Sequence, residues 1–199
     1  DVDICVLGGS ATGVFAAVRA ARLGARVAVV EKTNRFGGIA TNALVNVWHS
    51  LYDEIFEQQI IAGLTTEVID RLGRRGGLKV YKHKRTAYGL NTEELKIELD
   101  VLIPEATVRP FLHTMFVAPL AEDGRMLAAI IEDKTGRRAI RAKQFIDATG
   151  DADLVARMGL PVYQRDQVQP PTMCVILRGL NAIGQKHPKF KLQQVIFDP

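Results

Sequence analysis

The sequence predicts an α/β fold with a parallel sheet, and three observations carry this prediction. An apolar run at Val2–Leu7 leads directly into a turn of glycine and other small residues. An alanine-rich segment with apolar residues at helical spacing follows the turn and ends at Gly24. A second apolar run, at residues 26–30, then returns the chain to the sheet. Two strands joined by a crossover helix run parallel, so these elements form one βαβ unit.

The turn after the first strand has the spacing of a dinucleotide-binding turn. Gly8 allows the tight exit from the strand, and Gly13 lets the helix lie close to the sheet. The middle position is Ser10 instead of glycine, and its hydroxyl can donate to a phosphate oxygen. Glu31 ends the second strand about 20 residues later, where an acid can accept ribose hydroxyls. An ordinary strand-to-helix turn is the alternative, but the strand, helix and acid around it favour a nucleotide site.

Composition indicates a globular protein of one domain, or of one domain and part of a second. The chain has 199 residues, of which 47% are hydrophobic and 24% charged. No apolar run approaches the ~20 residues that span a bilayer, and no signal peptide is visible. We therefore expect a cytoplasmic protein with no membrane partner. Because the chain begins at Asp1, already inside the first strand, we also expect that some sequence upstream is missing.

Cysteines and charges exclude several classes of site. Cys5 lies in the first strand, where a core position is expected, and there is no CxxC pair or disulfide framework. The net charge is only +4. Basic residues cluster between positions 71 and 85, but no aromatic stacking platform accompanies them, so we expect a solvated face and no nucleic-acid partner. The histidines show no spacing typical of a metal site.

A loop with two adjacent glycines, Gly37 and Gly38, follows the second strand. Its bare backbone suits a second approach to a pyrophosphate, whereas a plain surface loop is the alternative. Here the sequence resembles flavoproteins with the glutathione-reductase-type FAD fold, a Rossmann-type fold, and most of all the FAD-dependent oxidoreductase family, which has a similar Gly-Gly-Ile-Ala-Thr stretch. The resemblance implies that Glu31 and the segment from Arg35 to Gly38 contact FAD.

Two helices and a meander are expected in the middle of the chain. Apolar spacing predicts an amphipathic helix over residues 54–73, and Asn91 predicts the N-cap of a helix that ends at Pro104. Short apolar runs at residues 111–119, 126–132 and 138–140 predict an antiparallel three-stranded meander. In the resembled fold, the backbone near Phe116 meets the adenine edge. A core strand is an equally good interpretation of Phe116 by spacing alone.

A later strand, followed by a turn, returns the chain to the nucleotide-binding sheet. Residues 144–147 read as a strand, and residues 152–158 as a helix with Asp151 at its N-cap. The turn between them resembles the second FAD motif of the family. The complete set of predicted FAD-binding residues is Gly8, Gly9, Ser10, Ala11, Thr12, Gly13, Glu31, Lys32, Arg35, Gly37, Gly38, Ala40, Thr41, Phe116, Ala148, Thr149, Gly150 and Asp151.

The resemblance also sets the expected domains. Residues 1–160 are expected to form the FAD-binding domain, with a helical insertion at about 51–90, and residues 161–199 to begin a substrate or cap domain that includes a strand at 173–177. The late segment that covers the flavin in this fold is not visible. We therefore expect that the chain is an incomplete N-terminal portion, which alone holds FAD weakly and shows no turnover.

The function expected from these motifs is an FAD-dependent oxidoreductase acting on a small organic substrate. Where disulfide reductases of this fold hold a cysteine pair, the chain has Ala40, Thr41 and Asn42, which excludes a dithiol mechanism. His49 is a weak candidate acid or base beside a flavin, and a structural or surface histidine is the alternative. A net non-redox enzyme of the same fold, such as a lyase or hydrolase, and a non-catalytic nucleotide-binding module both remain open. The sequence does not predict the oligomeric state.

Overall fold

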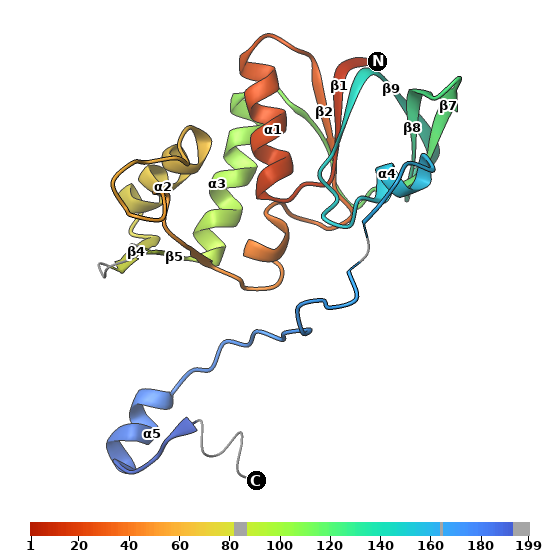
Figure 1. Cartoon of the computed structure of the whole chain (residues 1–199). Helices are drawn as coiled ribbons and strands as arrows, with labels where there is room; N and C mark the ends of the chain where they lie inside the picture. Colours follow the sequence, from red (N-terminus) through yellow and green to blue (C-terminus); the bar gives the residue numbers. More distant parts are fainter. Residues whose placement is uncertain (82–86, 164, 193–199) are drawn as a thin grey trace.

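The computed structural model describes residues 1–81, 87–163 and 165–192, and it confirms the predicted α/β fold with a largely parallel sheet (Figure 1). The main sheet has six strands in the order β6-β2-β1-β9-β8-β7, and a second sheet has three strands in the order β3-β5-β4. The main-sheet strands are β1 Val2–Leu7, β2 Val27–Val30, β6 Arg109–Phe111, β7 Met115–Glu122, β8 Arg125–Asp133 and β9 Gly136–Asp147. The small-sheet strands are β3 Val47–Trp48, β4 Leu78–Tyr81 and β5 Ala87–Leu90, and the helices are α1 Ala11–Arg22, α2 Leu64–Arg74, α3 Thr92–Glu105, α4 Asp153–Arg157 and α5 Leu180–Lys186.

Both faces of the parallel sheet are buried, each against a different layer. Successive side chains of a strand point to opposite faces. Val6 therefore packs in the cluster formed with α1 and α3, whereas Cys5 and Leu7 pack in the cluster formed with β8, β9 and α4. Cys5 is fully buried, and burial raises the pKa of its thiol to about 12. The prediction that Cys5 is a core residue is confirmed.

The meander joins the parallel sheet through one long strand. The first half of β9 pairs antiparallel with β8, and its second half pairs parallel with β1. The strands predicted separately at 138–140 and 144–147 are thus a single strand. The strand predicted at 111–119 is instead divided, because Phe111 ends β6 beside β2 and the chain turns at His113, with a φ of 50°, before Met115 begins β7. No glycine or proline marks that turn in the sequence.

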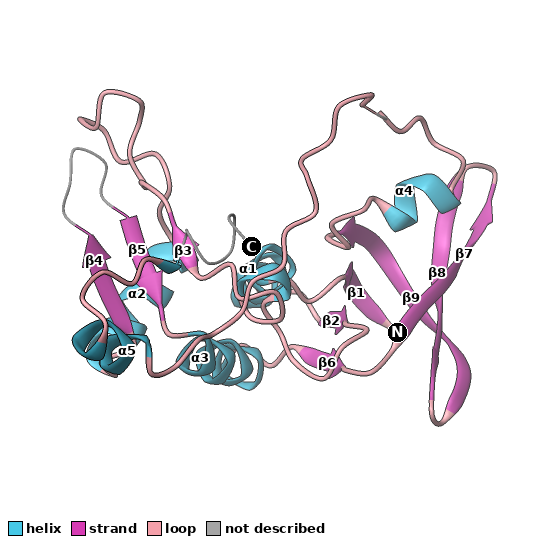
Figure 2. Cartoon of the chain, turned by 90° about the horizontal axis from the view of Figure 1, so that it is seen from below, coloured by secondary structure: helices cyan, strands magenta, loops and turns pink. Residues whose placement is uncertain are grey.

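The predicted helix at 54–73 is wrong in its first half. Helix α2 begins at Leu64, after Gly63 with a φ of 69°, and residues 54–62 form a loop. Tight backbone bonds shape this loop, since Asp53 N–H donates to Gln58 O at 2.8 Å. Its isoleucines are exposed, so the helical spacing that they extend is accidental. The sequence analysis also did not predict the small β3-β5-β4 sheet, whose strands lie on either side of α2 in the sequence. Figure 2 shows this sheet across the helices from β7 and β8.

Helix α3 begins where the sequence predicts. The Asn91 side-chain oxygen accepts the N–H groups of Glu93 and Glu94, at 3.0 Å and 3.4 Å, which confirms the N-cap. The helix does not stop at Pro104 but includes it and ends at Glu105. A proline in the last turn removes one intrahelical hydrogen bond, and this loss is small at a helix end.

Arg71, an arginine of the basic cluster, belongs to a set of ion pairs that joins three helices. Glu67 of α2 pairs with Arg22 of α1 at 2.6 Å and with Arg71 at 2.8 Å. Arg71 also pairs with Glu105 of α3 at 2.7 Å. These described basic residues therefore lie among acids. The cluster's Lys82, Lys84 and Arg85 lie outside the described residues.

The chain after α4 is extended and exposed. Residues 173–177, predicted as a strand, have no strand partner among the described residues, and their apolar side chains are exposed. Figure 1 shows this stretch running from the domain to α5. The domain boundary near residue 160 stays a prediction. Among the described residues, no helix is both long and apolar enough to cross a membrane.

We predict that Glu67 stabilises the helix layer in a pH-dependent way. Its hydrogen bond with Arg22, reinforced by Arg71, lowers the pKa of Glu67 to about 2 from 4.5. A carboxylate with a lowered folded-state pKa stabilises the fold above its unfolded pKa, and this stabilisation is lost as the pH falls through the folded pKa. In urea unfolding between about pH 7 and pH 3, the free-energy difference between wild type and Glu67→Gln should shrink below about pH 4.5. Glu122→Gln, at an exposed acid of β7, is the control, and a difference that is constant with pH would contradict the prediction.

Candidate nucleotide-binding site

The predicted site residues gather at the carboxyl ends of the parallel strands. Strand β1 leads into Gly8, β2 into Glu31, and β9 into Ala148. Because β1 pairs in parallel with both β2 and β9, all three strand ends meet at one edge of the sheet. This edge is where open α/β sheets bind ligands.

The first turn leads into the capped start of helix α1. Ser10 is the N-cap of α1, and its hydroxyl oxygen accepts the Gly13 N–H at 3.4 Å. The Thr12 N–H lies in the first turn of α1, where no intrahelical acceptor precedes it, and no partner for this group is found among the described residues. Such a group suits an anion at the positive end of the helix dipole. The sequence analysis missed the capping role of Ser10, although a serine directly before a helix is a known indication of one.

Gly8 and Gly13 bring the turn close to the rest of the sheet edge. A Cβ on Gly13 would lie 1.9 Å from the Gly8 carbonyl oxygen and 3.2 Å from Ala148 Cβ. Gly8 has a φ of 99°, and a Cβ there would lie 2.2 Å from the Ala148 carbonyl oxygen. The first turn and the return turn after β9 are therefore in contact through bare backbone.

The double-glycine loop lies against the first turn. Gly37 N–H donates to the Gly9 carbonyl oxygen at 2.8 Å, and Gly37 forms an isolated parallel bridge with Ser10. A Cβ on Gly38 would lie 2.9 Å from Ser10 Cβ. The two segments predicted to approach a pyrophosphate are thus neighbours, with no room for larger side chains between them.

The other predicted residues of this loop have local contacts. Arg35 donates from Nε to the Asn34 side-chain oxygen at 2.7 Å and does not line the cavity described below. Thr41 is buried, and its hydroxyl donates to the Phe36 carbonyl oxygen at 2.7 Å. Ala40 is buried as well. These side chains support the loop, so a ligand would meet its backbone.

Glu31 joins the first turn to the end of β2. Its carboxylate is 7% exposed and accepts Gly9 N–H on Oε2 at 2.7 Å. The other oxygen, Oε1, accepts Thr33 N–H at 2.8 Å. The Thr33 hydroxyl also lies within donating distance of Oε1, at 2.8 Å, so these three donors leave about one of the roughly four acceptor positions of a carboxylate for a ligand hydroxyl.

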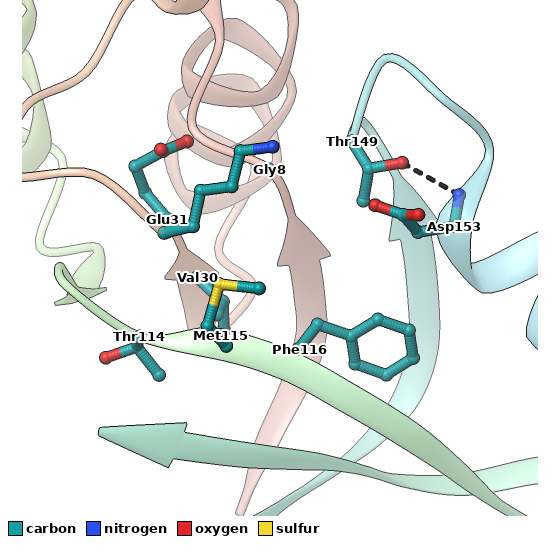
Figure 3. Close-up of a pocket in the computed structure, with 9 residues that line it drawn as sticks. Gly8, Val30, Glu31, Thr114, Met115, Phe116, Thr149 and Asp153 are labelled. Atoms are coloured by element: carbon teal, nitrogen blue, oxygen red, sulfur yellow. Dashed lines mark hydrogen bonds between the residues drawn. The ribbon is translucent and has the colours of Figure 1, made fainter.

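A cavity of about 60 Å³ opens between Glu31 and the return turn (Figure 3). Its walls combine polar groups with the apolar side chains of Val30, Met115 and Phe116. This volume is well below the roughly 300–1,000 Å³ of typical ligand pockets, so a nucleotide bound here would extend out of the cavity along the neighbouring surface. The complete lining is Gly8, Val30, Glu31, Lys32, Thr114, Met115, Phe116, Thr149 and Asp153. The sequence analysis missed Val30, Thr114, Met115 and Asp153, because nothing local indicates that β7 and α4 meet the ends of β1 and β2.

The return turn is organised by Asp147, which the sequence analysis placed only in a strand. Its carboxylate accepts the Thr149 hydroxyl at 2.7 Å and the N–H groups of Leu154 and Val155 at 3.0 Å and 3.1 Å. Partial burial raises the pKa of Asp147, but the hydrogen bonds from Thr149, Val155 and Leu154 outweigh burial and lower it overall. The acid therefore stays ionised as the anion that these donors require.

The prediction that Asp151 is the N-cap of the following helix is wrong. Helix α4 starts at Asp153, its N-cap position is Ala152, and no side chain of that position caps it. Thr149 instead accepts the Asp153 N–H on its hydroxyl oxygen at 3.0 Å. Asp151 and Gly150 are exposed, and Gly150 has a φ of 89°. Asp147 and Thr149 can cap from a distance because the turn folds back over them.

His49 is exposed at the end of β3 and does not line the cavity. Its neighbour Trp48 packs edge-on against Phe15 of α1, with ring centroids 6.3 Å apart. In the described part of the chain, no group of three or more His, Cys, Asp or Glu side chains could hold a metal ion.

Solved structures that are similar to this chain in fold include proteins with different described activities. THI4 of Thermovibrio ammonificans has a TM-score of 0.57 at 21% identity, over 79% of this chain and 61% of its own. A geranylgeranyl bacteriochlorophyll reductase-like protein of Thermoplasma acidophilum has a TM-score of 0.56 at 19% identity, over 80% and 42%. The myxobacterial halogenase CndH, described as a variant of FAD-dependent halogenases, has a TM-score of 0.57 at 16% identity, over 76% and 38%. The chain thus spans less than two thirds of the length of each.

No curated protein matches the chain in sequence. A family model described as FAD dependent oxidoreductase matches residues 3–197, which is nearly the whole chain. The glycine-rich turn, the buried acid after β2 and the return turn after β9 all lie within that match. The chain therefore belongs to the FAD dependent oxidoreductase family, whose cofactor is FAD.

Proposed function

We propose that this chain binds the adenosine diphosphate half of FAD and that the whole protein is an oxidoreductase acting on a small organic substrate. One observation carries the proposal. Gly9 donates its N–H to Glu31 and accepts the N–H of Gly37 on its carbonyl oxygen, so three segments predicted to bind FAD converge on one residue.

Glu31 is the proposed partner of the adenosine ribose. Its carboxylate borders the cavity and retains acceptor capacity beyond the donors of Gly9 and Thr33. Ribose hydroxyls can donate to it, whereas a 2′-phosphate would be repelled by its charge. This supports FAD over NADP as the ligand.

The pyrophosphate is proposed to lie over the start of α1. The Thr12 N–H, for which no partner is found among the described residues, lies in the first turn of α1, and the helix dipole favours an anion there. Gly38 brings further backbone next to Ser10. Lys32 lines the cavity beside Glu31 and can supply a cation.

The adenine ring is proposed to occupy the apolar part of the cavity. Val30, Met115 and Phe116 line it, and a flat aromatic base packs well against such side chains. The sequence analysis left Phe116 open between an adenine contact and a core position. Its half-buried place in the cavity wall supports the adenine contact.

FAD, when bound, supplies the hydride or electron transfer, and the protein supplies its orientation and surroundings.

The test of the proposed function has two stages. Calorimetric titration of the chain with ADP and with FAD should give saturable binding of comparable affinity, because the described cavity contacts the shared half. In the protein with its flavin bound, a small organic substrate added without oxygen should bleach the flavin's visible absorbance. Conversion of a substrate while the flavin stays oxidised throughout turnover would overturn the redox function.

We predict that Glu31→Ala weakens ADP binding about tenfold or more. Loss of hydrogen bonds to a charged acceptor costs about 1.5–3 kcal/mol, which corresponds to that change in affinity. The measurement is ADP titration of both proteins, with Glu122→Ala as a control at an exposed acid away from the cavity. Equal affinities in wild type and Glu31→Ala would remove Glu31 from the ribose site.

We predict that Gly13→Val abolishes nucleotide binding and impairs folding. The added side chain would overlap the Gly8 carbonyl oxygen, so α1 would have to move away from the turn. Thermal unfolding and ADP titration measure the two effects. Gly184→Val is the matched control, because a Cβ on this helical glycine meets nothing within 4 Å. Normal binding by Gly13→Val would show that the turn tolerates a wider approach of the helix.

A further inference from the structure

Strand β7 carries one extra residue beside the cavity. Phe116 pairs with Ile131, and Ala118 pairs with the adjacent Ile130, so Val117 has no residue opposite it in β8. A β-bulge of this kind takes backbone groups out of the ladder and changes the direction of neighbouring side chains. Phe116, directly before the bulge, is the residue whose side chain forms the aromatic wall of the cavity.

Arg157 contacts the bulge residue Val117 and the residue before it, Phe116. Its Nη1 donates to the Val117 carbonyl oxygen at 2.6 Å. Its guanidinium carbon lies 5.9 Å from the centroid of the Phe116 ring, within the ≈ 6 Å range of a cation–π interaction. One side chain thus satisfies a carbonyl at the bulge and covers the ring that precedes it.

The helix that carries Arg157 is itself held by the return turn. Arg157 is the last residue of α4, whose first N–H groups are accepted by Thr149 and Asp147. Thr149 and Asp153 line one side of the cavity and Phe116 lines the other, as Figure 3 shows. Helix α4 therefore connects the two walls, and Arg157 makes the contact with the second one.

We propose that Arg157 is a positioning residue for the base of the bound nucleotide: it sets the Phe116 ring against which the adenine packs. The inference rests on the proposed function, because it assigns a determinant of base preference to the same cavity. Arg157 need not contact the ligand. It acts by fixing the bulge and the ring, so its effect depends on the base and on Phe116.

The test compares two nucleotides that share a ribose and a diphosphate. Arg157→Met keeps an unbranched, flexible side chain but removes the guanidinium with its charge and donors. In calorimetric titrations of the 199-residue chain, this variant should bind ADP about threefold to tenfold more weakly, while UDP affinity changes less than about twofold. Arg157→Lys retains a cation over the ring and should recover part of the ADP affinity. Arg141→Met, at an exposed arginine of β9, is the control and should change neither.

A double-mutant cycle tests whether Arg157 acts through Phe116. In a Phe116→Leu background, Arg157→Met should cause no further loss of ADP affinity, because the ring that it positions is gone. Equal losses for ADP and UDP would overturn the inference and show that Arg157 only supports α4. Additive losses in the double variant would overturn it as well.

The outcomes separate this inference from the function on which it rests. If the wild-type chain binds neither ADP nor FAD, the proposed function fails and the inference fails with it. If the wild type binds ADP and Arg157→Met binds it equally well, only the inference is overturned.

Discussion

The carboxylate of Glu31 is the group on which the arrangement of the site depends. It accepts one N–H from the turn after β1 and another from the chain after β2, which fixes the relative position of the two strand ends. Gly9, the donor in the first bond, also accepts an N–H from the double-glycine loop. A buried carboxylate without such donors would be costly, so the fold and the acid require each other.

The glycines of this region serve the protein's own packing first. A Cβ on Gly9 would lie 2.8 Å from Glu31 Cβ and 2.6 Å from a ring carbon of Phe36, and one on Gly13 would overlap Gly8. These residues therefore bring backbone segments together before any ligand is present. In the described part of the chain, the Thr12 N–H at the start of α1 keeps no partner and is the donor that we propose for a phosphate.

The parts of the fold predicted well from the sequence are those fixed by local chemistry. Strand β1, the turn, α1 and β2 follow from spacing within about 30 residues, and Asn91 caps α3 by contacts with its own neighbours. The cavity walls could not be predicted in this way. Met115 and Asp153 line one cavity because β9 pairs with β1 on one side and with β8 on the other. The cap of α4 comes from Asp147, six residues before the helix begins. The helical part predicted before Gly63 is wrong for the opposite reason. Its isoleucines have helical spacing, but they are exposed and do not pack against the core.

The two halves of the candidate site are formed by different parts of the fold. Residues of the first βαβ unit are the ones that we propose face the ribose and phosphates, which every dinucleotide shares, and their positions leave little freedom because backbone atoms are in contact. The base side is formed by β7 and α4, where side chains and a bulge make the contacts. Side-chain contacts can change without disturbing the sheet. Base preference can therefore vary in this fold while phosphate binding stays constant.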